Sequence, residues 1–214
     1  MSHDKNAVRK ILDQAKAAGR EALTAPEARG VCEAYGITIP KEGVATSAEE
    51  AVKLASGIGF PVVMKIVSPQ ILHKTEAGGV IVGVKSAEQA KEAYATIVAN
   101  ARKYDAKAEI LGVQIQQMLM GGQEVIIGAV TDPAFGKLVA FGLGGILVEV
   151  LKDITFRLAP ASNEDALSML DGIQAAEILR GVRGAKPVDR AALSSMIERV
   201  SSLVADFPEI SEMD

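Results

Sequence analysis

The sequence is poor in the residues that mark several common classes of protein. It has no tryptophan, and aromatic residues make up only 4% of the chain, so a surface that stacks nucleic-acid bases is not expected. Its 23 Lys and Arg residues are outnumbered by 27 Asp and Glu residues, and the formal charge of -4 offers no basic surplus for nucleic acid. The single cysteine, Cys32, cannot form an internal disulfide, which favours the reducing cytoplasm.

Long hydrophobic segments are also missing. The longest apolar run, from Leu138 to Leu151, is shorter than the roughly 20 residues that a bilayer requires, and it contains Glu149. The first residues are polar and lack the apolar core of a signal peptide. We therefore expect a soluble, cytoplasmic protein with no membrane partner.

Several helices are predicted from caps and apolar periodicity. A capping box that begins at Ser86 is followed by apolar residues at helical spacing, which predicts a helix over 87–103. Ser47, Asp189 and Thr24 open similar stretches. Helices are therefore expected in both halves of the chain.

Short β-rich runs lie between the helical stretches: GITIP, FPVVMKIV, GVIVGV, GVQIQQML, EVIIGAV and KLVAFGLG. The segment TDPAFGK, between the last two runs, is typical of a hairpin connection through an Asp-Pro turn. Antiparallel pairing follows, which favours an α+β fold over a doubly wound sheet. We expect a lobe boundary near Gly112, with one lobe at 1–111 and another at 112–214.

The stretch SPQILHKTEAGGV combines a nucleophile, a cation and two glycines. A neutral imidazole at His73 can accept a phosphoryl group, and Lys74 would attract phosphate. Gly78 and Gly79 lack Cβ atoms, so backbone N–H groups there could approach an anion. An ordinary surface or core histidine beside an ordinary turn is the alternative, and the residues alone leave it open.

Other charged residues interrupt apolar runs. Lys65 lies on an otherwise apolar side of FPVVMKIV, where it would hold phosphate oxygens or face water. Glu124 begins a strand and would bind a ribose hydroxyl or simply face water. Glu149, Asp153 and Arg157 recur at four-residue intervals, which on a helix would form a solvated charge ladder. The glycine-rich segment FGLGGILVEVLKD, which contains Glu149 and Asp153, lacks the spacing of a dinucleotide fingerprint or a P-loop, so close packing of strand and turn explains its glycines as well as contact with a ligand does.

Three blocks in the same order resemble the ATP-grasp domain of ADP-forming acyl-CoA synthetases, the beta-subunit part of the acetate–CoA ligase family. They are FPVVMKIVSPQILHKTEAGGV, VQIQQMLMGGQEVIIGAVTDPAFGKLVAFGLGGILVEVLKDITFRLAP and FPEISEMD, and the resemblance runs from about Ala25 to Asp214. It implies an ATP-grasp fold whose two lobes each carry a mainly antiparallel sheet and flanking helices. Mg-ATP would be held between the lobes.

The resemblance also implies roles for individual residues. His73 matches the family's second histidine, which relays phosphate between ADP and a histidine of the separate alpha part. Gln116, Gln117 and Met118 would supply the adenine hinge through backbone groups, and Asp214 matches an acidic ligand of magnesium. The full set of nucleotide-binding residues would be Lys65, Lys74, Gly78, Gly79, Gln116, Gln117, Met118 and Glu124.

Cofactors and partners follow from the same resemblance. ATP or ADP and Mg²⁺ would bind this chain, a small carboxylic acid would be the second substrate, and CoA would bind an alpha subunit or fused domain in an oligomer. The family pattern continues beyond Asp214 with further metal ligands, so we expect the second lobe to be truncated at its end. An alternative is the non-catalytic regulatory ATP-grasp domain of a protein acetyltransferase, although His73 favours the enzyme.

Overall fold

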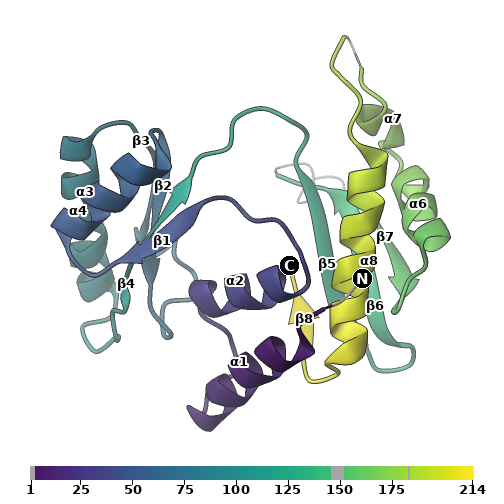
Figure 1. Ribbon diagram of the computed structural model, residues 1–214, viewed down its shortest axis with the longest axis horizontal. Coiled ribbons are helices and arrows are strands. Elements are labelled where there is room, and N and C mark those ends of the chain that lie inside the picture. Colours follow the sequence, from purple (N-terminus) through teal and green to yellow (C-terminus); the bar gives the residue numbers. More distant parts are fainter. Residues whose placement is uncertain (1–2, 146–151, 183) are drawn as a thin grey trace. The chain divides into compact units, whose positions relative to one another are not determined.

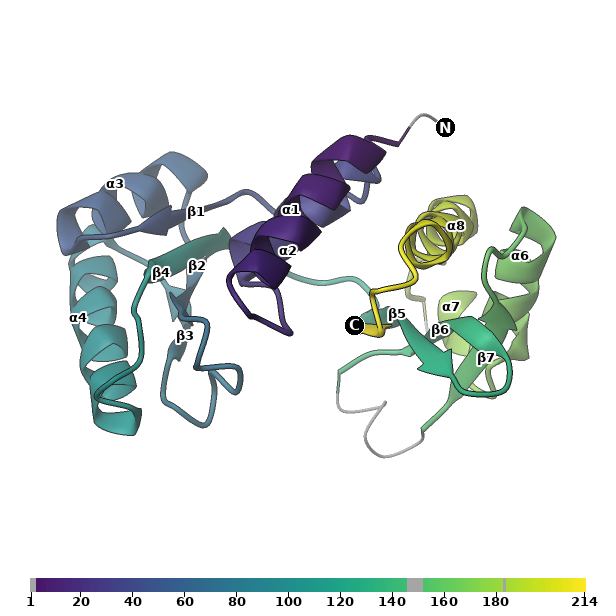
Figure 2. The same ribbon diagram turned by 90° about the horizontal axis from the view of Figure 1, so that it is seen from below.

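The structure is a computed structural model, drawn as a ribbon in Figure 1 and from a perpendicular direction in Figure 2. It describes residues 3–145, 152–182 and 184–214. Helices accompany two separate antiparallel sheets, which confirms the expected α+β fold. None of the helices within the described ranges has the length and apolar character needed to cross a membrane.

The chain divides into two compact units. We call the part that runs to Ala34 and resumes over Thr38–Met120 the N-terminal unit, and the rest, Tyr35–Ile37 with Gly121–Asp214, the C-terminal unit. The boundary expected near Gly112 is therefore wrong. The strand that starts there pairs with two strands of the N-terminal unit, so the chain leaves that unit only after Met120.

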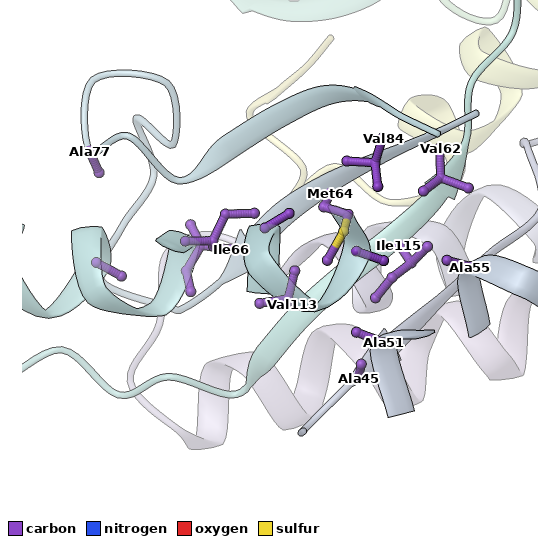
Figure 3. Close-up of a cluster of buried hydrophobic side chains, with 14 of the residues drawn as sticks. Ala45, Ala51, Ala55, Val62, Met64, Ile66, Ala77, Val84, Val113 and Ile115 are labelled. Atoms are coloured by element: carbon purple, nitrogen blue, oxygen red, sulfur yellow. The ribbon is translucent and has the colours of Figure 1, made fainter. Parts of the chain in front are cut away.

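The N-terminal unit contains a sheet of four antiparallel strands in the order β1, β4, β2, β3. Their bounds are β1 (Glu42–Ala45), β2 (Val62–Val67), β3 (Val80–Val84) and β4 (Gly112–Gln117). Because side chains alternate along a strand, one face of β2 buries Met64 and Ile66 completely. Figure 3 shows these two side chains gathered with Val113 and Ile115 of β4. Lys65 consequently belongs to the opposite face.

Helices cover the buried face of this sheet. They are α3 (Ala48–Ile58) and α4 (Ala87–Tyr104), and small residues such as Ala51 and Ala55 let α3 pack closely against the core (Figure 3). The predicted caps are confirmed, since the Ser47 and Ser86 side chains each accept a hydrogen bond from a backbone N–H three residues later. The helix predicted over 87–103 matches α4 to within one residue.

Two further helices precede this sheet, α1 (Lys5–Ala17) and α2 (Ala25–Ala34), and they pack against each other. As predicted, α2 begins directly after Thr24, whose backbone N–H donates to the Glu27 carboxylate at 2.8 Å. Arg20 forms two hydrogen bonds with that carboxylate, at 2.6 and 2.7 Å. Glu27 therefore joins the connection between α1 and α2 to the first turn of α2.

The C-terminal unit has a second antiparallel sheet in the order β7, β6, β5, β8. Its strands are β5 (Val125–Asp132), β6 (Gly136–Leu143), β7 (Ile154–Leu158) and β8 (Glu212–Met213). The helices are α6 (Asn163–Gly172), α7 (Ala176–Leu179) and α8 (Arg190–Asp206). The predicted β5–β6 hairpin is confirmed, and Asp132 closes it by accepting two backbone N–H hydrogen bonds. Helices α6 and α8 pack side by side and contact the sheet (Figure 2).

The strand predicted at GITIP is wrong. Tyr35 and Gly36 lie against α8 instead, where Arg199 donates hydrogen bonds to both of their backbone carbonyls, at 3.1 and 2.9 Å. The Tyr35 hydroxyl donates to the Asp206 carboxylate at 2.7 Å. These contacts hold the segment in the C-terminal unit, and the first strand of the chain starts only at Glu42.

Candidate functional site

The loop between β2 and β3 carries His73 into solvent. The imidazole is 76% exposed, and its Nδ1 lies 4.0 Å from the Glu76 carboxylate, which is also exposed. The His73 carbonyl accepts a hydrogen bond from the backbone N–H of Ala77, which is buried at the base of the loop. The loop therefore exposes a nucleophilic side chain, while Ala77 anchors the loop in the N-terminal unit.

Gly78 and Gly79 shape this loop. Gly78 has a left-handed φ of 61°, and its carbonyl accepts a hydrogen bond from the Asn100 amide at 2.9 Å. At Gly79, an added Cβ would come within 2.5 Å of Ile66 Cγ2. The Gly79 N–H donates to the Lys74 carbonyl at 2.8 Å, and the Gly78 N–H also donates within the loop. Both glycines thus have a structural reason to be glycine, and both N–H groups are engaged in the loop's own turns.

Lys65 extends from β2 on the face opposite the core and is partly buried. Its Nζ donates a hydrogen bond to the Gln116 side-chain oxygen at 2.9 Å. Burial lowers the pKa of Lys65, the charge of Glu42 raises it, and the charge of the nearby Lys74 lowers it again. The fully solvated alternative does not describe this lysine. A partly desolvated ammonium beside a second cation is suited to an anionic ligand.

The proposed adenine hinge lies at the end of β4. Gln116 and Gln117 belong to this inner strand, and Met118 follows it. The backbone N–H of Gln117 donates to the Lys41 carbonyl at 2.8 Å, and that of Met118 donates to the Pro61 carbonyl at 3.3 Å. The backbone N–H groups of Gln117 and Met118 therefore already have partners within the unit.

In the C-terminal unit, Glu124 directly precedes β5 and is exposed. Its carbonyl accepts a hydrogen bond from the Gly144 N–H at 2.9 Å. An added Cβ at Gly145 would meet the Glu124 carboxylate at 2.5 Å. Within the described residues, these glycines of FGLGG therefore leave room for the backbone and side chain of Glu124, which supports close packing as one of their functions.

Asp214 follows β8 and is exposed. A Cβ added to Gly128 of β5 would lie 3.5 Å from the Asp214 Cα, so this residue is close to the sheet. Within the ranges that the structure describes, no three His, Cys, Asp or Glu side chains form a group that could hold a metal ion. A single carboxylate nevertheless fits Mg²⁺, which commonly binds one or two protein carboxylates together with substrate phosphates and water.

The charge ladder considered from the sequence is absent where the structure describes the segment. Asp153 is only 7% exposed and precedes β7, and its two carboxylate oxygens accept hydrogen bonds from the Gln174 and Ala175 N–H groups at 2.7 and 2.8 Å. Arg157 lies within β7. Glu149 falls outside the described residues. Asp153 thus links the start of a strand to the turn before α7 and has a structural function.

The chain thus folds into two antiparallel sheets, and the N-terminal sheet presents Lys65 on the strand that leads into the His73 loop. A model of the ATP-grasp domain family matches residues 14–214. The chain belongs to the ATP-grasp domain family. It is 52% identical over 206 residues to the beta subunit of acetate–CoA ligase (ADP-forming) I of Pyrococcus furiosus, covering 96% of this chain and 88% of that protein.

Other ATP-grasp relatives differ in length. The chain is 50% identical over 211 residues to the 4-hydroxybutyrate–CoA ligase (ADP-forming) of Nitrosopumilus maritimus, covering 99% of this chain but only 30% of that protein. Among solved structures, it is similar to the dinucleotide-forming acetyl-coenzyme A synthetase 1 of Ca. Korarchaeum cryptofilum in complex with coenzyme A and Ca-AMPCP. That match has a TM-score of 0.91 and 43% identity, and covers 95% of this chain and 89% of that chain.

A second structure of the same synthetase contains coenzyme A and Mg-AMPPCP, with its phosphohistidine segment pointing towards the nucleotide-binding site. The match has a TM-score of 0.78 and 40% identity, and covers 91% of this chain and 84% of that chain. These relatives bear out the ATP-grasp fold and the homology to beta subunits of ADP-forming acetate–CoA ligases that the sequence blocks indicated.

Sequence reasoning missed the surroundings of Lys65. The polar group next to Lys65 consists of Glu42, Gln116 and Arg29. From the sequence, only Gln116 of this group was singled out, and it was singled out for its backbone. The only signal in the sequence was the presence of charged or polar residues in short strands, which does not identify their neighbours across the sheet.

Proposed function

We propose that this chain is the nucleotide-handling ATP-grasp part of an ADP-forming acyl-CoA ligase, and that His73 carries a phosphoryl group to and from the nucleotide. One observation carries the proposal: the His73 imidazole, 76% exposed, lies on the loop that follows the strand bearing Lys65. A nucleophile accessible to a second protein and a cation suited to phosphate thus occur on one supersecondary unit.

The phosphoryl step needs few groups. A ring nitrogen of His73 attacks the terminal phosphorus of ATP, an N–P bond forms, and the P–O bond to ADP breaks, so that ADP leaves with the electron pair. The reverse step makes ATP. Lys65 and Lys74 offset the negative charge of the transferred group and the departing phosphates. Bound through Asp214 and the nucleotide phosphates, Mg²⁺ would supply further charge neutralisation.

We infer that the acyl chemistry takes place elsewhere. The Pyrococcus furiosus relative is named as a beta subunit, and the Nitrosopumilus maritimus relative is more than three times as long as the part that matches this chain. These lengths support a CoA-binding alpha subunit or fused domain as the partner. The net reaction would convert acyl-CoA, ADP and phosphate into free acid, CoA and ATP, reversibly.

The test is a ligase assay of this chain supplemented with a CoA-binding alpha subunit. ADP release should require Mg-ATP, CoA and a suitable acid from a panel of small carboxylic acids. His73→Ala should abolish turnover while nucleotide affinity, measured by calorimetry, stays within a few-fold. Nucleotide binding without ADP release for any acid would instead favour the regulatory function of an ATP-grasp domain.

A further inference from the structure

A chain of polar contacts runs across one face of the N-terminal sheet and ends at Lys65. The Lys65 Nζ donates to Gln116 Oε1 at 2.9 Å, and Gln116 Nε2 donates to Glu42 Oε2 at 2.7 Å. On the far side, Arg29 of α2 lies 3.7 Å from the Glu42 carboxylate and donates to the Glu42 carbonyl at 2.9 Å. Three strands and one helix therefore contribute to a single path.

The sheet register creates this path. Glu42 and Gln116 are directly opposite each other on β1 and β4, and Gln116 is opposite Val63 on β2. Lys65 is two residues beyond Val63 and therefore on the same face, diagonal to Gln116. Directly opposite and diagonal neighbours on one face are within reach of long side chains. The inner strand thus places the Gln116 amide between a carboxylate and an ammonium.

The charges on both sides fix how the Gln116 amide is oriented. An ammonium can only donate and a carboxylate can only accept, so the amide oxygen must face Lys65 and the amide nitrogen must face Glu42. The Glu42 side chain is only 6% exposed, and an anion buried to that extent requires charged or hydrogen-bonded partners. Glu42 is therefore a fixed negative charge, and one neutral side chain, that of Gln116, connects it to Lys65.

We propose that Glu42 and Gln116 are positioning residues that hold the Lys65 ammonium in its charged form and in place for a nucleotide phosphate. The proposal rests on the proposed function, because that function gives Lys65 its ligand. Among the described residues, the charges that act on Lys65 are Glu42 from β1 and Lys74 from the loop after β2, with Arg29 of α2 behind Glu42. Glu42 raises the pKa of Lys65 and opposes both burial and the charge of Lys74.

The decisive variant is Glu42→Gln, which keeps a hydrogen-bond acceptor for Gln116 but removes the negative charge. Mg-ATP affinity should be measured by calorimetry at about pH 7 and about pH 9.5. Since the Lys65 pKa should fall in this variant, its affinity should drop at least about threefold more between the two pH values than that of the parent protein. Glu33→Gln is the matched control, because Glu33 pairs with the same Arg29 on the exposed side.

A rescue variant separates electrostatics from packing. In Glu42→Gln/Gln116→Glu, the carboxylate moves one position along the path and contacts Lys65 directly, while the new glutamine at position 42 can donate to it. The affinity at high pH should return at least to the parent value. A variant that acts only by disturbing the fold would lower affinity at both pH values, and the second substitution would not restore it.

A ligand-free readout keeps this inference distinct from the proposed function. An NMR titration of isotope-labelled lysine, assigned with Lys65→Met, should show a lower Lys65 pKa in Glu42→Gln and no such change in Glu33→Gln. An unchanged Lys65 titration would overturn the positioning role, even if nucleotide binds. Failure of the parent protein to bind Mg-ATP would overturn the proposed function, whatever the lysine titration shows.

Discussion

Substituting Gly79 by alanine tests how tightly the base of the His73 loop is packed. The added Cβ would lie 2.5 Å from Ile66 Cγ2 and 3.1 Å from the Lys74 carbonyl oxygen. Ile66 is completely buried, and its N–H donates to the Gly79 carbonyl at 2.8 Å, so the clash cannot be relieved by moving a free side chain. Overpacking of this kind costs about 1–3 kcal/mol of unfolding free energy.

For a chain of this size, each kcal/mol shifts Tm by about 2–4 °C, so Gly79→Ala should melt about 2–12 °C lower. Circular dichroism during heating measures this shift. Gly57→Ala is the matched control, since Gly57 lies in α3 with no atom within 4 Å of its added Cβ. The control should be neutral or more stable by up to about 1 kcal/mol, because alanine favours a helix. A Gly79→Ala protein that melts with the parent would refute the packing argument.

Three further predictions concern single side chains. Lys65→Met keeps an apolar stem but removes the ammonium, so Mg-ATP binding measured by calorimetry should weaken by about 1–3 kcal/mol, and an unchanged affinity would mean that Lys65 does not contact phosphate. Asp153→Asn replaces one of two carboxylate acceptors by a donor, so urea unfolding should show a loss of about 1–3 kcal/mol, and an unchanged midpoint would remove the linking role of Asp153. The Glu27 pKa falls from its ordinary 4.5 to about 2, chiefly through hydrogen bonding to Arg20. Its stabilisation is therefore complete above pH 4.5 and disappears as pH falls through about 2, so Glu27→Gln should flatten the acid-induced loss of Tm across that window, and parallel curves would contradict the assignment.

Local signals predicted much of the fold. Ser47 and Ser86 cap helices because a short hydroxyl side chain satisfies a free N–H in the first helical turn, which requires no tertiary information. The β5–β6 hairpin was predictable from its Asp-Pro turn because a turn, too, is determined by neighbouring residues. The strand predicted at GITIP was wrong because hydrogen bonds from Arg199, more than 160 residues away in the chain, hold the Tyr35 and Gly36 carbonyls against α8.

The sequence singled out candidate site residues but not the contacts that connect them. His73 and Lys65 stood out because their chemistry is unusual in their local surroundings. The alignment of Glu42 with Gln116 depends on the register of two strands 74 residues apart, which no local pattern encodes. The N–H groups of Gly78 and Gly79 were predicted to be available to an anion, but the structure uses them within the loop's turns. A glycine is suited both to an anion-binding loop and to a tight internal turn, so the sequence could not distinguish these two arrangements.

Phosphorylation by Mg-ATP distinguishes a phosphoryl-carrying His73 from an ordinary surface histidine. The 214-residue chain should be incubated with Mg²⁺ and ATP labelled in its terminal phosphate, and acid-labile, base-stable phosphate on the protein should then be measured. We expect label on the parent protein and on His3→Asn, which changes the only other histidine, and none on His73→Asn. Label that persists in His73→Asn, or no label on a parent protein that binds Mg-ATP, would contradict the phosphoryl-carrying function of His73.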